Sequence, residues 1–374
     1  MRNFFLWTIG CQYNVHDGIR VGYLLNRLGF IESPAEEANF IIILACAVRQ
    51  TAVDRILGKL RDWKGKKIIV SGCVLPADRK KLAAAGVLFW NIEKPQDLAD
   101  ILSIKDKRQI KALFQEGAKL SSYVPIMVGC NNFCSYCAVP YTRGRERSRP
   151  MEEVIRDVKS IIRTKAPTPR LRTSGDRSSG LRPREIMLLG QNVNSYKISQ
   201  KSKVESQKCK LKAKTESDFT KLLKALNNLE GDFAISFISN HPKDMEDDII
   251  KAVATLPKIK KSIHLPLQSG SNKILKAMNR PYTKEQYLKI VEKIRRADSK
   301  IEITTDVIVG FPGETEVDFQ QTVEAFKKVG YALAYINKYS PRAGTAAFKL
   351  GDPISWDEKK RRWKILNELA NHKN

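Results

Sequence analysis

The sequence predicts an α/β protein, with an open parallel α/β domain at the amino terminus and a partial (β/α)6 barrel after it. Short apolar runs alternate with amphipathic stretches along the 374 residues, which is typical of parallel strands covered by helices on both faces. Six strand–helix units follow residue 121, too few for a complete eight-stranded barrel. We expect domains at 1–105 and 121–374, joined by a linker at 106–120.

The amino-terminal domain is expected to place three cysteines at one edge of its sheet. Its expected strands are 4–9, 40–44, 67–71 and 88–90, and its expected helices are 17–28, 53–62 and 77–85. Cys11, Cys46 and Cys73 each follow one of the first three strands by two residues. The carboxyl ends of parallel strands meet at one edge of a sheet, where ligands collect. Three unrelated buried thiols are the alternative, but the repeated offset favours a metal or cluster site.

The second domain repeats the strand–helix order with two interruptions. Strands are expected at 123–128, 186–189, 233–239, 262–267, 301–309 and 331–339. Helices are expected at 151–163, 218–228, 244–256, 283–297, 316–329 and 357–371. The segments near 165–184 and 199–215 are rich in Arg or Lys, with Pro, Ser and Gly in the first, and we interpret both as exposed basic insertions.

The net charge indicates a polyanionic partner. Lys and Arg number 66 against 40 Asp and Glu, which leaves a formal charge of +26. Nucleic acid is the commonest partner of so basic a chain, although solvated lysines in loops are an alternative. The apolar runs are far shorter than the ~20 residues that cross a bilayer, so we expect a cytoplasmic protein with no membrane partner. In a reducing compartment the seven cysteines would serve as ligands or nucleophiles.

The most specific motif is a compact loop of three cysteines directly after a strand. Cys130, Cys134 and Cys137 have the spacing C-x3-C-x2-C. Three thiolates can hold three irons of a 4Fe-4S cluster and leave the fourth iron open for another ligand. Zinc is the alternative, but a tetrahedral zinc site needs a fourth Cys or His nearby, and no such residue is adjacent.

This loop is the signature of the radical S-adenosylmethionine enzymes, and residues 129–150 resemble the methylthiotransferases, especially the MiaB-like tRNA branch. The resemblance extends through almost the whole chain. Its further matches are 10–12, 46–49 and 72–73 in the first domain, and 189–196, 241–244, 264–271, 305–316 and 339–346 in the second. Tyr13 stands where that family usually has Met.

The resemblance implies two 4Fe-4S clusters and S-adenosylmethionine as cofactors. The cluster at Cys130, Cys134 and Cys137 would cleave S-adenosylmethionine to a radical, and Cys11, Cys46 and Cys73 would hold a second, auxiliary cluster that carries the sulfur. The implied product is a 2-methylthio group on isopentenylated adenosine beside the tRNA anticodon. We also expect an electron donor such as flavodoxin or ferredoxin, and a monomer. Members usually carry an RNA-binding TRAM domain at the carboxyl terminus, and we expect none within these 374 residues. Either the sequence is truncated before that domain, or the protein binds tRNA through its own basic surface.

Six residues are candidates for binding S-adenosylmethionine. Gln191, Asn192, Gln268, Ser269 and Ser271 lie at expected strand ends, and Asp306 lies within an expected barrel strand. Loop capping is the alternative for the first five, and a structural hydrogen bond is the alternative for Asp306. Four arginines after the cysteine loop are candidates for gripping phosphate, with a solvated charged face as the alternative: Arg143, Arg145, Arg147 and Arg149.

Other functions remain open at this point. Related methylthiotransferases act on threonylcarbamoyl-adenosine in tRNA or on an aspartate of a ribosomal protein. A non-catalytic iron–sulfur protein that binds RNA or transfers electrons is a more distant alternative. The open three-cysteine loop and the motifs at the strand ends favour the enzyme, because electron transfer requires neither.

Overall fold

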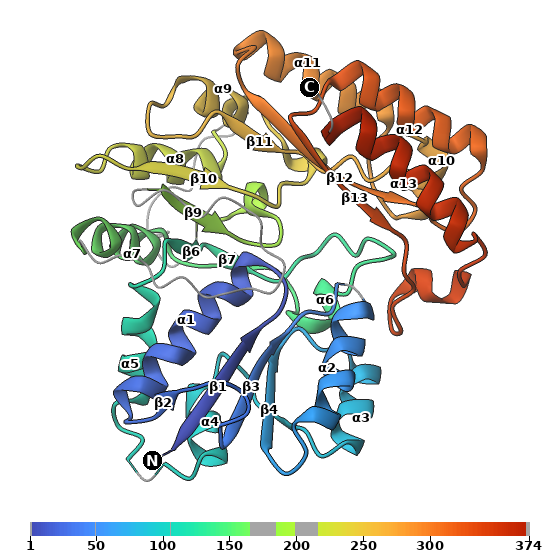
Figure 1. Ribbon diagram of the computed structural model, residues 1–374. Coiled ribbons are helices and arrows are strands. Elements are labelled where there is room, and N and C mark those ends of the chain that lie inside the picture. Colours follow the sequence, from blue (N-terminus) through green and yellow to red (C-terminus); the bar gives the residue numbers. More distant parts are fainter. Residues whose placement is uncertain (1, 49, 105, 165–184, 199–215, 372–374) are drawn as a thin grey trace, which may run out of the picture.

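The computed structural model describes residues 2–48, 50–104, 106–164, 185–198 and 216–371. Two α/β units follow one another along the chain, and the first lies below the second in Figure 1. The expected basic insertions at 165–184 and 199–215 lie outside the described residues. Within the described ranges, no helix has both the length and the apolar character needed to span a bilayer.

The first unit contains a five-stranded parallel sheet in the order β2-β1-β3-β4-β5. Its strands are β1 (Asn3–Thr8), β2 (Ile31–Glu32), β3 (Phe40–Ala45), β4 (Lys67–Gly72) and β5 (Leu88–Phe89). The central strand β3 is buried on both faces, because Ile41 and Ile42 point to opposite sides and both are fully inaccessible. The open parallel sheet expected from the sequence is therefore confirmed.

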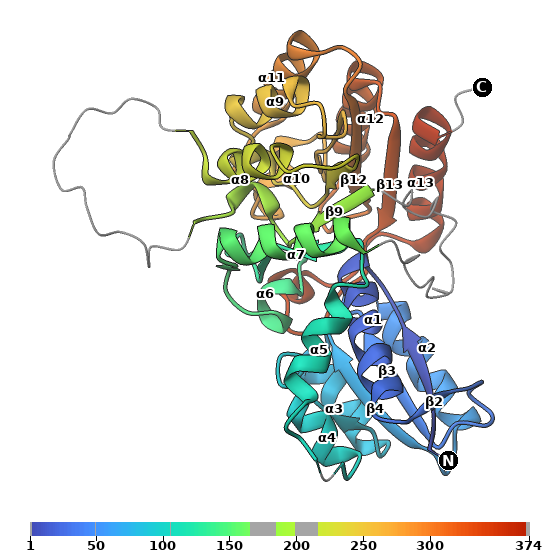
Figure 2. The same cartoon turned by 90° about the vertical axis from the view of Figure 1, so that its left-hand side faces the viewer.

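Helices cover both faces of this sheet. On one face lie α1 (Gln12–Arg27), α4 (Pro95–Ile101) and α5 (Ile110–Ala118), and on the other lie α2 (Gln50–Asp62) and α3 (Pro76–Ala84). Figure 2 shows α5 beside α1. Leu113 and Phe114 of α5 are buried in the same core as Leu24 and Leu25 of α1. The segment 106–120, expected to be a linker, therefore contributes a packed helix to the first unit.

The second unit contains six parallel strands in chain order. They are β6 (Tyr123–Pro125), β9 (Glu185–Leu189), β10 (Ala234–Phe237), β11 (Ser262–His264), β12 (Glu302–Val309) and β13 (Leu333–Lys338). The first three form one sheet and the last three another. Between β10 and β11 the ladder is interrupted, and Ile235 of β10 forms only an isolated bridge, to Ile259 ahead of β11. The expected partial (β/α)6 barrel is confirmed, with a break in its hydrogen bonding.

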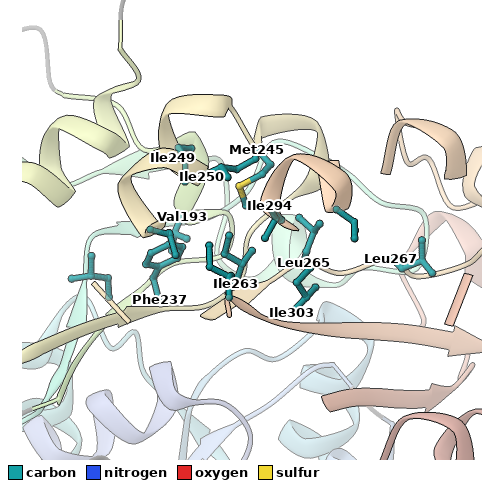
Figure 3. Packing of buried hydrophobic residues seen from close by; sticks show 14 of the residues in the cluster. Val193, Phe237, Met245, Ile249, Ile250, Ile263, Leu265, Leu267, Ile294 and Ile303 are labelled. Carbon is teal, nitrogen blue, oxygen red and sulfur yellow. The ribbon is translucent and has the colours of Figure 1, made fainter. Parts of the chain in front are cut away.

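An outer layer of helices covers this curved sheet. It comprises α7 (Met151–Arg163), α8 (Asp218–Asn227), α9 (Asp247–Thr255), α10 (Asn272–Ala277), α11 (Lys284–Ala297), α12 (Glu316–Val329) and α13 (Trp356–Asn371). Between layers lies a continuous core, in which Phe237, Ile249 and Ile263 pack together in Figure 3. Along β12, alternate residues such as Val307 are fully buried, whereas Thr304 and Asp306 are only partly covered. Those partly covered residues share the opposite face of the strand.

A short hairpin breaks the first barrel strand. The N–H of Ile126 donates to Leu189 of β9, while its carbonyl accepts from the N–H of Arg149. The chain thus changes partner at Ile126, and β7 (Met127–Val128) pairs antiparallel with β8 (Arg147–Ser148). The strand expected at 123–128 is therefore two strands. The loop between β7 and β8 contains the three-cysteine motif and the short helix α6 (Val139–Thr142).

A buried arginine of the second unit, Arg342, contacts residues of the first unit. Arg342 follows β13, and its side chain is 1% exposed. Its Nε donates to the carbonyl of Ala47 at 2.9 Å, and its Nη2 lies 2.6 Å from Oδ2 of Asp78. Arg342 also contacts the side-chain oxygen of Gln50. All three partners belong to the first unit, so this side chain holds the carboxyl edge of the first sheet against the barrel.

We expect Arg342→Met to destabilise the protein strongly. The change would leave the Asp78 carboxylate, which is 4% exposed, without its cation. Removing one partner of a buried ion pair typically costs about 3–5 kcal/mol of unfolding free energy. Urea denaturation measures this loss. The control is Lys59→Ala, which removes an exposed ion pair with Asp62 and should cost less than about 1 kcal/mol. Equal midpoints for the two variants would contradict the role of Arg342.

Candidate functional site

The first three cysteines lie where strands of the first sheet meet helices. Cys11 is the residue before α1, Cys46 follows β3, and Cys73 follows β4. Their loops pack tightly against one another. Gly10 has a φ of 109°, and a Cβ there would lie 2.6 Å from the Cβ of Cys46. Gly72 has a φ of 89°, and its Cβ would lie 2.7 Å from the carbonyl oxygen of Ala45. Only glycine permits this approach, which brings the strand-end loops together.

The second group of cysteines lies in the loop between β7 and α6. Gly129 precedes Cys130 with a φ of 82°, and a Cβ there would lie 2.2 Å from the carbonyl oxygen of Arg145. The N–H of Gly129 donates to Oε1 of Gln191 at 2.6 Å. The other end of the loop is held by Ser135, whose Oγ donates to the carbonyl of Ala277 at 2.9 Å. Gln191, expected to bind S-adenosylmethionine, thus holds the loop in this structure.

The thiols of each group affect one another. All six cysteines are free of disulfides. Burial, and then the neighbouring Cys11 thiol, raise the pKa of Cys46 to about 12. Burial, and then Cys134, raise the pKa of Cys137 to about 12. Repulsion between neighbouring thiolates thus adds to burial in keeping these thiols protonated. Metal ions bind thiolates, so loading either group would release protons.

The donor set of each group is chemically suited to an iron–sulfur cluster. Over the described residues, no three His, Cys, Asp or Glu side chains converge closely enough to hold one metal ion. A cubane cluster makes a different demand, because each of its three cysteine ligands bonds a different iron. Two sets of three thiols, each packed in glycine-containing loops, supply soft ligands of that kind.

Two arginines contact the cysteine sulfurs, and the sequence did not indicate either contact. Nε of Arg143 lies 3.0 Å from Sγ of Cys73, and Nη1 of Arg280 lies 3.4 Å from Sγ of Cys134. Arg143 had been expected to grip phosphate. Its side chain is instead 8% exposed and points into the junction between the units.

The other three arginines after the loop also have partners within the chain. The guanidinium of Arg145 stacks on Phe133 at 4.3 Å from the ring centroid. Arg147 pairs with Glu93, and Arg149 pairs with Asp157 at 2.8 Å. The phosphate-gripping row expected from the sequence is therefore occupied by internal contacts, although Arg145 and Arg147 stay exposed.

Three amide side chains lie beyond the ends of successive barrel strands. Asn192 follows β9, Asn240 follows β10, and Gln268 follows β11. The side-chain oxygen of each is buried without a hydrogen-bond partner among the described residues. Nε2 of His241 is likewise buried and unpartnered, and burial lowers the pKa of this imidazole to about 2. Buried polar atoms usually have a partner, which can be protein, water or a ligand, so these four atoms are open to partners that the described chain does not supply.

Ser269 and Ser271, also expected at the cofactor, serve as caps in this structure. Oγ of Ser271 donates to Oδ1 of Asp318 at 2.7 Å and accepts from the N–H of Ile274 at the start of α10. Oγ of Ser269 accepts from the N–H of Ser271 at 3.2 Å. Both serines are 1% exposed. Their contacts match the capping alternative that the sequence left open.

Asp306 lies on the partly covered face of β12, next to an imidazole. Its Oδ2 is 2.9 Å from Nε2 of His264, and Nδ1 of His264 is 2.9 Å from Oγ1 of Thr304. The side chain of Asp306 remains 34% exposed, so the carboxylate is still accessible to a ligand. Sequence reasoning named Asp306 but missed His264, because only the parallel register of β11 and β12 brings the two together.

Two known protein families match the chain, one over each of its two units. The profile of the radical SAM superfamily matches residues 124–326, and that of the uncharacterized protein family UPF0004 matches residues 3–89. The first match includes the loop of Cys130, Cys134 and Cys137. The second includes Cys11, Cys46 and Cys73.

Similar proteins are found among bacterial enzymes. The chain is 36% identical over 397 residues to a tRNA-2-methylthio-N(6)-dimethylallyladenosine synthase of Carboxydothermus hydrogenoformans, covering 99% of this chain and 83% of that protein. It is 40% identical over 391 residues to a synthase of the same name from Thermoanaerobacter pseudethanolicus, covering 97% and 77%.

Solved structures share the fold at low sequence identity. The radical S-adenosylmethionine methyltransferase TsrM from Kitasatospora setae is 10% identical, with a TM-score of 0.54 over 93% of this chain and 77% of that chain. The cobalamin-dependent radical enzyme OxsB is also 10% identical, with a TM-score of 0.52 over 98% and 56%. With the near-complete matches to the synthases and the two groups of cysteines in place, the chain belongs to the radical SAM superfamily and, within it, to the family of the tRNA-2-methylthio-N(6)-dimethylallyladenosine synthases.

Proposed function

We propose that this protein is a tRNA methylthiotransferase, which places a methylthio group at C2 of adenine in N6-isopentenyladenosine beside the anticodon. The observation that carries the proposal is the pairing of two three-thiol sites at one junction. Arg143 lies six residues after Cys137, and its side chain contacts Cys73 of the other group. In this proposal, one open cluster for radical formation lies beside another for sulfur delivery. The names of the relatives supply the substrate.

In this proposal, each unit holds one of the two clusters through its own three cysteines. Cys130, Cys134 and Cys137 hold the 4Fe-4S cluster of the superfamily, whose open iron takes S-adenosylmethionine. We assign a second 4Fe-4S cluster to Cys11, Cys46 and Cys73. When bound, the first cluster supplies the electron that cleaves S-adenosylmethionine, and the second supplies the sulfur. Gln191 supports this chemistry by fixing the glycine that precedes Cys130.

The strand ends bind S-adenosylmethionine in this proposal. The buried oxygens of Asn192 and Gln268 accept hydrogen bonds from its amine donors once the loops adjust to the ligand. Asp306 offers a carboxylate to a further donor, while His264 orients it. Ser269 and Ser271 shape the same loop through their capping contacts.

The remaining partners follow from charge and chemistry. A chain with a net charge of +26 attracts the phosphates of tRNA. The electron for the first cluster comes from a donor such as flavodoxin or ferredoxin. We propose that the enzyme works as a monomer in the cytoplasm, where thiols remain reduced.

Iron content tests the two-cluster assignment directly. Reconstituted protein should hold about eight irons per chain, because each group of three cysteines binds a cluster of four. Replacing Cys11, Cys46 and Cys73 together by Ala should reduce the content to about four, and so should replacing the other group. Cys209→Ala, which changes the one cysteine outside both groups, should leave the content unchanged. A native content of about four would remove the second cluster from the proposal.

The two sites should fail in different ways when one ligand is removed. Cys134→Ala should abolish formation of 5′-deoxyadenosine, because the open cluster can no longer bind S-adenosylmethionine productively. Cys46→Ala should retain 5′-deoxyadenosine formation but lose methylthiolated adenosine, since sulfur delivery depends on the other cluster. Chromatography with mass spectrometry of the nucleosides measures both products. If Cys46→Ala made normal amounts of methylthiolated product, the first group of cysteines would be structural.

A further inference from the structure

We propose that two buried arginines, Arg143 and Arg280, set the reduction potentials of the two clusters separately, each by placing its positive charge and a donated N–H against one cysteine sulfur. This inference rests on the two-cluster arrangement proposed above. It adds a role for residues that neither the sequence motifs nor the family comparison assigns.

Arg143 occupies a site built to hold it against Cys73. Its Nε donates to Sγ of Cys73 at 3.0 Å, and its Nη2 donates to Oδ1 of Asn14 at 2.8 Å. The guanidinium also lies 4.2 Å from the ring centroid of Tyr13 and 3.8 Å from Oδ2 of Asp17. Contacts at Nε, at Nη2 and over one face of the guanidinium therefore hold the planar group, and its Nε is aimed at one sulfur.

Asn14 is itself fixed, which makes the contact with Cys73 rigid. Its Nδ2 donates to the carbonyls of Ile9 at 2.7 Å and Ala45 at 2.9 Å. Ile9 lies two residues before Cys11 and Ala45 lies directly before Cys46, so Asn14 ties Arg143 to the other two cysteine loops as well. Because Arg143 belongs to the second unit, the contact also sets how closely the two units approach.

Arg280 has the equivalent position beside the other group. Its Nη1 lies 3.4 Å from Sγ of Cys134, its Nε donates to the hydroxyl of Tyr282 at 2.9 Å, and its Nη2 donates to the carbonyl of Pro266 at 3.2 Å. The residue is 7% exposed. Its three partners are a sulfur, a phenol and a peptide carbonyl, so its charge acts on a poorly solvated neighbourhood that contains Cys134.

The physical effect of both contacts has a definite sign. Reduction adds one electron from the external reductant and makes a cluster more negative by one charge. A nearby cation and an N–H donated to a ligating sulfur both stabilise that additional charge, more so in a buried site than in water. Each arginine should therefore raise the potential of its own cluster. A guanidinium does not titrate in this range, so no proton accompanies the electron on account of the arginine.

The effects of Arg143 and Arg280 on the two reduction potentials should be separable, because the two arginines share no partner among these contacts. In full-length protein that keeps only Cys130, Cys134 and Cys137, Arg280→Met should lower the cluster potential and Arg143→Met should not change it. In protein that keeps only Cys11, Cys46 and Cys73, the two variants should exchange roles. Redox titration followed by electron paramagnetic resonance measures both potentials.

We expect the affected cluster to become at least tenfold harder to reduce, which for one electron is about 59 mV. The matched control is Arg145→Met, which removes an arginine of the same loop that stacks on Phe133 and for which no contact with a cysteine sulfur is seen. It should leave both potentials unchanged. The shifts should also be the same at pH 7 and pH 9, since the arginine charge is constant across that range.

The outcomes distinguish this inference from the proposed function. Native potentials in both methionine variants, each with its cluster loaded, would overturn the role of the arginines. Native protein with about four irons would instead overturn the two-cluster assignment. If Arg143→Met did not retain its cluster, Arg143→Gln would decide the question, because it keeps an N–H donor without the charge. A native potential in that variant would likewise overturn the inference that the charge sets the potential.

Discussion

The structure depends on bringing six cysteines to the junction between the two units and on supplying cations there. The positive charge of those cations can balance the negative charge of the thiolates. Each group of cysteines has a buried arginine within hydrogen-bonding reach of one sulfur, Arg143 for Cys73 and Arg280 for Cys134. A third, Arg342, pairs with buried Asp78 and closes the same junction. Burying a cation is costly unless an anion or several polar atoms surround it. These arginines therefore stabilise the junction only while the groups around them stay in place, which couples the packing of the units to the state of the cysteines.

Glycine decides how close the cysteine loops come to one another. Gly10, Gly72 and Gly129 all have positive φ, and a side chain at any of them would collide with a neighbouring loop. The parallel sheet determines which loops become neighbours, because β1, β3 and β4 are adjacent and end at the same edge. Backbone freedom at these positions and strand order thus act together. Neither alone would gather Cys11, Cys46 and Cys73.

The barrel contributes a different kind of candidate site, whose side chains are amides and a carboxylate rather than thiols. The unpaired oxygens of Asn192, Asn240 and Gln268 follow three successive strands. The pair of Asp306 and His264 lies on β12 and on the last of those three strands, β11. Packing fills the outer side of these strands with Ile303, Val307 and similar residues. The division between apolar and polar faces follows from the alternation of side chains along a strand, so the same strands supply both the core and the proposed ligand site.

The sequence by itself determined the two α/β units and the order of the barrel strands. It also indicated which six cysteines form the two groups of three. It could do so because strand periodicity and cysteine spacing are local, and because parallel strands end at a common edge. It did not reveal that the segment 106–120 contains the packed helix α5, that the strand at 123–128 breaks at Ile126, or that Ser271 caps a helix. Only the tertiary structure decided which arginines reach the sulfurs, since Arg143 and Cys73 are 70 positions apart and Arg280 and Cys134 are 146 apart. An arginine side chain takes its partner from whatever the fold places around it, and no local pattern in the chain encodes that neighbourhood.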